Sequence, residues 1–68
     1  MNNTKNIIDY GAVSSVEINQ SKAIQAAIDA CWKDGGGEVI VPEGRYLTGD
    51  IRLRSNITLH LQRNAQLI

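Results

Sequence analysis

The spacing of hydrophobic residues along this chain changes at a run of three glycines. Before Gly35-Gly36-Gly37, apolar residues recur at helical spacing, and after it they alternate as they do in β-strands. Glycine readily adopts the left-handed conformation that closes a last helical turn, so this run is expected to end a helix. The sequence therefore predicts one helix followed by several short strands.

The predicted helix extends from about Gln20 to Lys33 and has an apolar face that needs a partner surface. Asn19 or Ser21 is expected to cap it, because a short side-chain oxygen there accepts a hydrogen bond from an unpaired backbone N–H. At 100° per residue the apolar stripe comprises Ile24, Ala27, Ile28 and Cys31, flanked by Ala23 and Trp32. The opposite, solvated face comprises Lys22, Gln25, Asp29 and Lys33.

Short strands are predicted on both sides of the helix. Upstream, Ile7-Ile8 predicts a strand that enters a turn at Asp9-Tyr10-Gly11. Downstream, the residues expected to point to one side are Val39 and Val41, Ile51 and Leu53, and Ile57, Leu59 and Leu61. The bends between these strands are expected at Pro42 and Gly44, at Gly49-Asp50, and at Ser55-Asn56.

The strand region also repeats itself. A shift of 20 positions superposes Val39 on Leu59, Val41 on Leu61, Gly44 on Asn64 and Leu47 on Leu67. Glycine and asparagine are the residues that best tolerate positive φ, so the third match indicates a repeated corner. Two successive coils of a β-solenoid would produce this period.

A solenoid explains why a helix precedes the strands. The first coil exposes an apolar end, and an amphipathic helix is suited to cover it. We expect a single partial domain, with a strand and capping helix at about 6–34 and the first coils at about 38–68. Because the last residues, 65–68, form an uncovered strand, we expect the natural protein to continue and this piece to self-associate.

Length and composition exclude several classes of protein. A chain of 68 residues buries only a modest core, and its single Cys31 excludes an internal disulfide. Seven basic and seven acidic residues leave no net charge, which argues against nucleic-acid and membrane-surface partners. No apolar run is long enough to span a bilayer, and residues 1–5 lack the apolar core of a signal peptide. The compartment stays open.

Two groups of residues resemble a known family. The first group is Ile8-Asp9-Tyr10-Gly11-Ala12-Val13, residues 21–31 (SKAIQAAIDAC), and residues 35–46 (GGGEVIVPEGRY), which resemble the opening of pectin-degrading β-helix proteins. The second is residues 46–61 (YLTGDIRLRSNITLHL), which is similar to the polygalacturonase family of glycoside hydrolases. Residues 14–18 (SSVEI) depart from the glycine- and aspartate-rich turn of that family.

The resemblance implies a right-handed, single-stranded parallel β-helix whose parent protein hydrolyses galacturonic-acid linkages with inversion. It also implies a secreted or periplasmic parent and a pectin-like substrate. The family's Asn-Thr-Asp, Asp-Asp, Gly-His-Gly and Arg-Ile-Lys motifs are absent from this chain. We therefore expect no catalytic, cofactor-binding or metal-binding residue here, no cofactor, and no activity from the 68 residues alone.

The residues that could nevertheless do chemistry have simpler structural interpretations. The aspartates are expected on the helix face, at the helix exit or in turns: Asp29, Asp34, Asp9 and Asp50. His60 should point outward and has no second histidine with which to bind a metal. Cys31 is expected in the core, without a base to activate it. The glycine run follows a helix, the reverse of the order in phosphate-binding loops.

Aromatic and basic residues leave a binding role open. Trp32 and Tyr46 could stack on a sugar ring, but core coverage is the simpler interpretation. The arginines that could line a groove for an anionic polymer are Arg45, Arg52, Arg54 and Arg63, with a solvated face as the alternative. Two functions are compatible with the sequence: the N-terminal part of a polygalacturonase-like hydrolase, or a non-catalytic carbohydrate-binding or tailspike-like solenoid module.

Overall fold

The computed structural model describes residues 4–68, so the start of the segment considered for a signal peptide, residues 1–3, lies outside the described residues. The element order is β1 (Thr4–Asn6), the 3-10 helix η1 (Ile7–Tyr10), α1 (Ser21–Lys33), β2 (Gly37–Val41), β3 (Gly44–Tyr46), β4 (Ile57–Leu61) and β5 (Ala65–Leu67).

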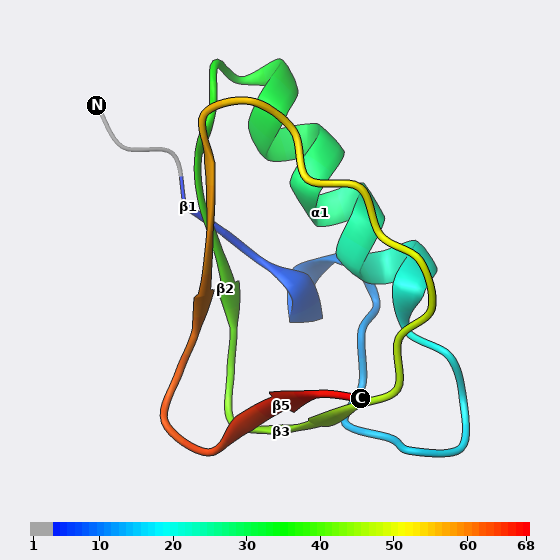
Figure 1. The fold of residues 1–68 in the computed structure, drawn as a ribbon. Helices are drawn as coiled ribbons and strands as arrows, with labels where there is room; N and C mark the ends of the chain where they lie inside the picture. The colour runs from blue at the N-terminus through cyan, green and yellow to red at the C-terminus, as the bar shows by residue number, and fades with distance from the viewer. Residues whose placement is uncertain (1–3) are drawn as a thin grey trace.

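All strand pairs are parallel and form two small sheets. The larger sheet has the order β1-β2-β4, and the smaller sheet pairs β3 with β5. Figure 1 shows the two sheets as two sides of a triangle, with α1 as the third side. Successive parallel strands that return to the same sheet make this the start of a parallel β-helix, as predicted, and right-handed connections are the rule for such strands.

Helix α1 follows its predicted apolar stripe. Its buried residues are Ile24, Ala27, Ile28 and Cys31, the four that helical spacing indicated. The prediction that Asn19 or Ser21 caps the helix is wrong, because the N-cap is Gln20 and its side chain makes no capping bond. Asn19 still contributes, since its Oδ1 accepts from the backbone N–H of Ser21 at 2.7 Å. At the other end, the backbone N–H of Gly36 donates to the Cys31 carbonyl at 2.9 Å, and Gly35 and Gly36 both have φ of +98°. The glycines end the helix as expected.

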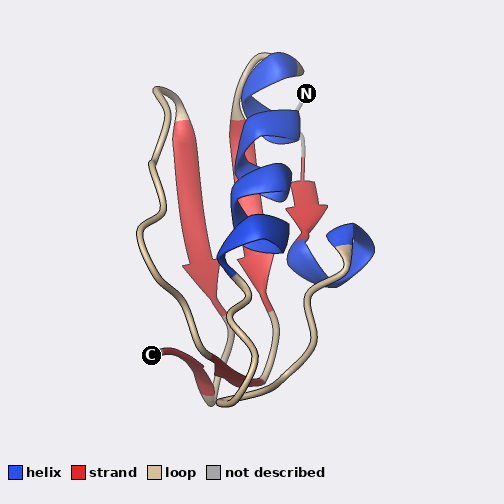
Figure 2. Cartoon of the chain, turned by 90° about the vertical axis from the view of Figure 1, so that its right-hand side faces the viewer, coloured by secondary structure: helices blue, strands red, loops and turns tan. Residues whose placement is uncertain are grey.

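The core lies between the helix and the two sheets, and Figure 2 shows α1 lying over the larger sheet. Val39 and Val41 alternate inward from β2 and Tyr46 inward from β3, and all three are nearly inaccessible to solvent. They pack with the apolar stripe of α1 and with Ile7 and Ala12. Tyr46 is therefore a core residue, and its hydroxyl donates to the Glu43 carbonyl at 3.2 Å. Burial raises the pKa of this phenol.

The predicted repeat of 20 residues holds in the larger sheet, whereas paired residues of the smaller sheet are one position further apart in the sequence. Val39 pairs with Leu59 and Val41 with Leu61, as predicted. In the smaller sheet Gly44 pairs with Ala65 and Tyr46 with Leu67, so the predicted matches of Gly44 to Asn64 and Leu47 to Leu67 are wrong by one position. The corner after β4 contains one residue more, and Asn64 accommodates it with a φ of +65°.

The strand predicted around Ile7-Ile8 is also displaced. The strand is Thr4–Asn6, and Ile7 and Ile8 belong to η1. Asn6 explains the change, because its side-chain oxygen accepts from the backbone N–H of Ile8 at 2.9 Å and turns the chain. Gly11, at a φ of +96°, then closes η1. As a result Ile7 is buried and Ile8 is exposed.

No strand forms at Ile51 and Leu53, where alternation predicted one. The segment 47–56 instead runs along α1, as the yellow segment of Figure 1 shows. The backbone N–H of Arg52 donates to Gln25 Oε1 at 2.7 Å, and Gln25 Nε2 donates to the Arg52 carbonyl at 3.0 Å. Helix side chains thus satisfy this backbone in place of a neighbouring strand. Ile51 packs against the core, but Leu53 is 61% exposed.

Residues 12–20 pack against the first coil near β3 and the residue that follows it. Ser15 forms a parallel bridge with Tyr46, and the Leu47 N–H donates to the Ser15 carbonyl at 2.9 Å. Gln20, which the sequence did not single out for burial, is only 4% exposed. Its side chain accepts from the Val13 N–H at 3.0 Å and donates to the Ile18 carbonyl at 2.8 Å, so it links the two ends of the loop before α1.

Candidate functional site

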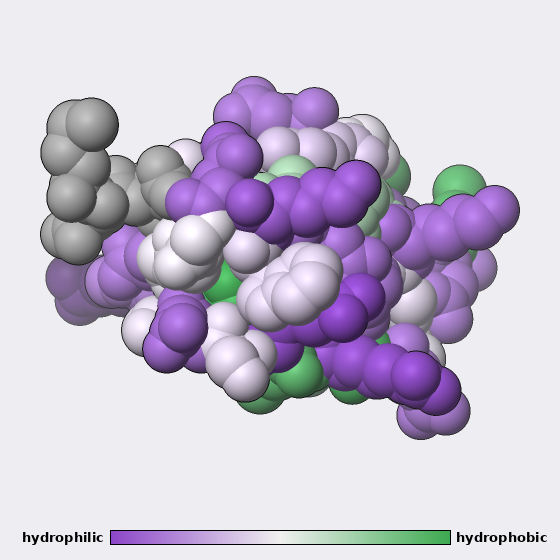
Figure 3. All heavy atoms as spheres, turned by 90° about the horizontal axis from the view of Figure 1, so that it is seen from above, coloured by the Kyte–Doolittle hydropathy of each residue, from purple (hydrophilic) through white to green (hydrophobic). Residues whose placement is uncertain are grey.

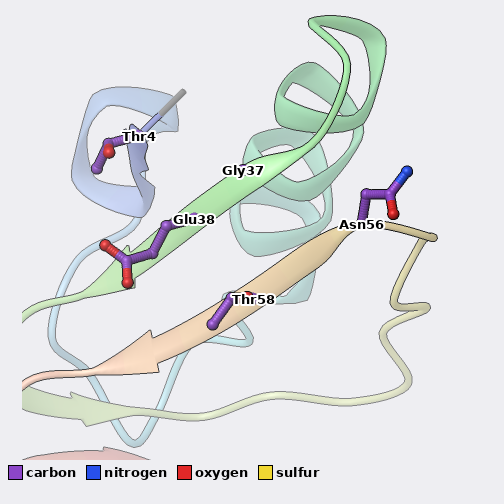
Figure 4. A pocket seen from close by; sticks show the side chains of 5 residues that line it. All are labelled: Thr4, Gly37, Glu38, Asn56 and Thr58. Atoms are coloured by element: carbon purple, nitrogen blue, oxygen red, sulfur yellow. The ribbon is translucent and has the colours of Figure 1, made fainter. Parts of the chain in front are cut away.

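A shallow polar hollow lies on the outward face of the larger sheet. It has a volume of about 260 Å³ and is lined by Thr4, Gly37, Glu38, Asn56 and Thr58. These residues come from all three strands of the sheet and from the turn before β4, as Figure 4 shows. Since Val39 and Val41 point inward, strand alternation directs Glu38 outward into this hollow.

The strand register aligns the polar side chains into a row. Thr4 of β1 pairs with Glu38 of β2, and Glu38 pairs with Thr58 of β4. A carboxylate thus stands between two hydroxyl groups on neighbouring strands. Hydroxyls both donate and accept hydrogen bonds, and a carboxylate accepts them, so the row is suited to polar ligands such as sugar hydroxyls.

His60 extends the row. Its Nδ1 lies 3.0 Å from Glu38 Oε2, and both side chains are partly exposed, 51% and 37%. The outward direction predicted for His60 is confirmed. The contact is an ion pair when the imidazole is protonated and a hydrogen bond when it is neutral. Glu38 could not be identified from the sequence, because its position opposite two threonines depends on the register between strands.

The hollow does not contain the machinery of an inverting glycosidase. Such enzymes use two carboxyl groups about 6.5–9.5 Å apart, one as acid and one as base. Of the residues that line the hollow, Glu38 supplies the carboxylate and the others are neutral. Within residues 4–68, no three His, Cys, Asp or Glu side chains gather closely enough to hold a metal ion.

The four aspartates lie in separate places. Asp9 lies in η1, rather than in a turn, and Asp50 is exposed in the segment after β3. Asp34 follows α1 and forms a 2.8 Å ion pair with Lys5 of β1. Hydrogen bonding to Asp34, reinforced by its charge, raises the pKa of Lys5.

Asp29 is not simply on a solvated face. Gln25 Nε2 donates to its Oδ1 at 3.0 Å, and Arg54 Nε donates to the same oxygen at 3.1 Å. The Gln25 hydrogen bond and then the Arg54 contact lower the pKa of Asp29. The predicted solvated side of α1 is therefore the side against which residues 47–56 dock, which periodicity within the helix could not indicate.

Cys31 is a core residue, as expected. It is inaccessible to solvent, and its Sγ lies 3.9 Å from the Glu38 carbonyl oxygen. Burial raises the pKa of the thiol, which disfavours the thiolate that nucleophilic chemistry requires.

The aromatic and basic candidates divide into two groups. Tyr46 is buried, so the expectation of a core role is confirmed for it, whereas Trp32 is 43% exposed and does not belong to the core cluster. The Arg54 guanidinium carbon lies 4.5 Å from the centre of the Trp32 ring. Arg45 is exposed in β3, and Arg63 is exposed in the corner between β4 and β5.

A second hollow lies beside α1 at the start of the chain. Its volume is about 540 Å³, and its lining is largely apolar: Tyr10, Gly11, Val13, Ile18, Asn19, Gln20, Lys22, Ala23 and Ala26.

Among the described residues, 4–68, the helices are too short and too polar to span a membrane.

Known proteins with similar sequences include pectin-degrading enzymes. A probable polygalacturonase of Vitis vinifera is 37% identical over 65 residues, which cover 91% of this chain and 13% of that protein. An exo-poly-alpha-D-galacturonosidase of Dickeya chrysanthemi is 41% identical over 63 residues, covering 93% of this chain and 10% of that enzyme. The chain therefore spans only a small part of these relatives. No family model matches the sequence.

Solved structures show the same fold in proteins with different functions. The family 28 exopolygalacturonase of Yersinia enterocolitica superposes with a TM-score of 0.90 at 39% identity, over 98% of this chain and 12% of that one. The A-module of the mannuronan C-5 epimerase AlgE6 of Azotobacter vinelandii gives 0.88 at 33% identity, over 93% and 19%. PfbA, a surface adhesin of Streptococcus pneumoniae, gives 0.87 at 39% identity, over 96% and 15%.

These comparisons confirm two of the expectations from the sequence. The chain resembles a segment of polygalacturonase-type proteins, and its fold is that of the start of a parallel β-helix.

Proposed function

We propose that this chain forms the N-terminal cap and first coils of a polygalacturonase-type glycoside hydrolase that acts on a pectin-like polysaccharide. The observation that carries the proposal is the combined match in sequence and fold, which extends over 98% of the chain in an exopolygalacturonase. In this proposal residues at about 6–34 form the cap and those at about 38–68 the coils, and the catalytic carboxylates belong to other parts of the protein.

The experiment compares two proteins in a reducing-end assay on polygalacturonate. One is the 68-residue chain, and the other is the longest protein encoded in frame with it. We expect activity from the longer protein only. Activity of the short chain would overturn the proposal that it contains no catalytic residue, and inactivity of both proteins would overturn the hydrolase proposal.

A non-catalytic binding module is the second candidate. It is favoured by the likeness to the adhesin PfbA, which superposes as well as the enzymes do. Reducing-end release distinguishes the two, because a binding module would retain polysaccharide on an affinity gel without cleaving it.

The edge of the second coil supports a proposal about assembly. β4 and β5 are edge strands; Leu61, the last residue of β4, and Ile68, which follows β5, are exposed at 41% and 45%. Exposed edge strands beside apolar side chains recruit further strands. We expect the 68-residue chain to self-associate through this edge and a Leu61→Lys variant to do so less. A strictly monomeric, folded species in sedimentation would contradict this.

A further inference from the structure

The one tryptophan of the chain is exposed near the end of α1. Trp32 retains 43% of its surface in contact with solvent, although large aromatic side chains are usually covered. Arg54 lies against it with its guanidinium carbon 4.5 Å from the ring centre, a cation–π arrangement. The two residues come from different parts of the chain, the helix and the segment that runs along it.

Arg54 is held in place by a second contact. Its Nε donates to Asp29 Oδ1 at 3.1 Å, and Gln25 holds the same carboxylate oxygen at 3.0 Å. Within residues 4–68, the Arg54 guanidinium contacts Asp29 through Nε and lies over the Trp32 ring. The two terminal nitrogens form the outer fork of the guanidinium, which matches a carboxylate in bidentate geometry.

The surroundings of Trp32 are basic. Lys33 follows it on the helix, and Arg52 precedes Arg54 by two residues; both are exposed. Asp29 offsets the charge of Arg54, and Asp34 offsets that of Lys5. Among residues 4–68, the excess positive charge at this end therefore comes from Lys33 and Arg52. The local balance therefore favours an anionic ligand, although the net charge of the chain is zero.

The character of this end of the molecule favours a polar ligand. Figure 3 looks down on the end where α1 finishes, and hydrophilic residues dominate it, with hydrophobic ones only in small separate areas. An apolar protein partner would require a larger continuous apolar surface. A uronic-acid polymer combines an amphipathic sugar ring with one carboxylate per residue, which suits an indole next to an arginine fork.

We propose that Trp32 and Arg54, with Lys33 and Arg52 beside them, form a binding surface for a uronate-bearing polysaccharide. A sugar ring stacks on the part of the indole that Arg54 leaves exposed, and the carboxylate of a neighbouring residue of the polymer binds the Arg54 fork. This inference rests on the proposed function, because it takes an acidic polysaccharide as the ligand. The surface is separate from the hollow around Glu38 and requires no catalytic residue.

Trp32 makes the test direct, because it is the chain's single tryptophan and reports its own environment. The 68-residue chain is titrated with oligogalacturonate, and with an uncharged maltooligosaccharide as a control, while indole fluorescence is followed. We expect a saturable change with oligogalacturonate only, which weakens as salt is added. Arg54→Gln should weaken binding about tenfold, equivalent to about 1.4 kcal/mol.

The matched control is Arg63→Gln. It removes the same charge from an exposed arginine in the corner between β4 and β5. We expect less than a twofold effect, as estimated for a screened distant charge. Circular dichroism confirms that both variants remain folded. Equal weakening by the two variants would overturn the proposal, because it would indicate attraction by overall charge.

Affinity electrophoresis in polygalacturonate gels distinguishes binding at the Trp32–Arg54 surface from pectin binding elsewhere on the protein. Trp32→Ala should abolish the retardation that the unaltered chain shows. Retardation that persists in Trp32→Ala and Arg54→Gln would overturn this surface while leaving a pectin-binding function intact. Absence of both retardation and fluorescence change would overturn the surface, and the hydrolase proposal would still be decided by reducing-end release.

Discussion

Substituting Gly36 by alanine tests how closely the helix exit is packed against the second coil. Gly36 has a φ of +98°, and a Cβ built there would lie 2.6 Å from both the Cβ and the carbonyl oxygen of Asn56. Gly35 has the same φ, but a Cβ at that position meets nothing within 4 Å. Gly35→Ala is therefore a matched control with the same backbone strain and no contact.

The expected magnitudes follow from these two environments. An L-residue in the left-handed region costs about 1–2 kcal/mol, and both variants incur this cost. Gly36→Ala must also displace Asn56, and overpacking of this kind costs about 1–3 kcal/mol. Displacing Asn56 also weakens the hydrogen bond that the Gly37 N–H donates to the Asn56 carbonyl at 2.8 Å. A chain of 68 residues has roughly 3–10 kcal/mol of stability in total, so the additional cost of Gly36→Ala over Gly35→Ala is a large part of it.

Urea unfolding measures the difference, with circular dichroism and Trp32 fluorescence as probes at one fixed protein concentration. With an m-value of about 1 kcal/mol/M, Gly36→Ala should unfold at a urea midpoint about 1–3 M below that of Gly35→Ala. Equal midpoints would refute the reasoning, because they would show that strain alone matters and that the Asn56 turn moves aside freely.

Three further predictions concern the core and the effect of pH. Ile28→Ala, at a fully buried position, should cost about 2–5 kcal/mol in urea unfolding, whereas the exposed Ile8→Ala should change little. The pKa of Asp29 is lowered in the folded chain, so its stabilisation is present above the ordinary Asp pKa of about 4 and is lost as pH falls through the folded value. Thermal melts should therefore show Asp29→Asn less stable than the unaltered chain at neutral pH, and a persistent gap in strong acid would contradict this. The pKa of Cys31 is raised by burial, so stability should fall as pH rises above about 8.5, the ordinary thiol value. Cys31→Ala should flatten that alkaline decline, and an unchanged slope would exclude Cys31 as its cause.

The candidate hollow shows why sequence reasoning found only part of the surface chemistry. His60 was correctly directed outward, because strand alternation is a local property. Its partner Glu38 was not selected, since the pair depends on β2 and β4 lying side by side with a diagonal contact of 3.0 Å. The Trp32–Arg54 contact likewise joins residues whose proximity depends on how residues 47–56 cross the helix.

Several features of the fold could be predicted from residue spacing along the chain. These are the four-residue buried stripe of α1, the glycine exit, the inward direction of Val39 and Val41, and the 20-position pairing of β2 with β4. Each follows from a period of 3.6 or 2, or from a glycine that tolerates positive φ.

The hydrogen-bond partners of the backbone, in contrast, depend on how segments distant in sequence pack together. Residues 51–53 alternate like a strand, yet the backbone of Arg52 bonds to the Gln25 side chain because this segment runs along α1. The corner after β4 contains an additional residue, which shifts β5 by one position relative to β3. Alternation determines which side chains can face the core, but a strand requires a neighbouring strand, and that neighbour is fixed by packing between segments distant in sequence.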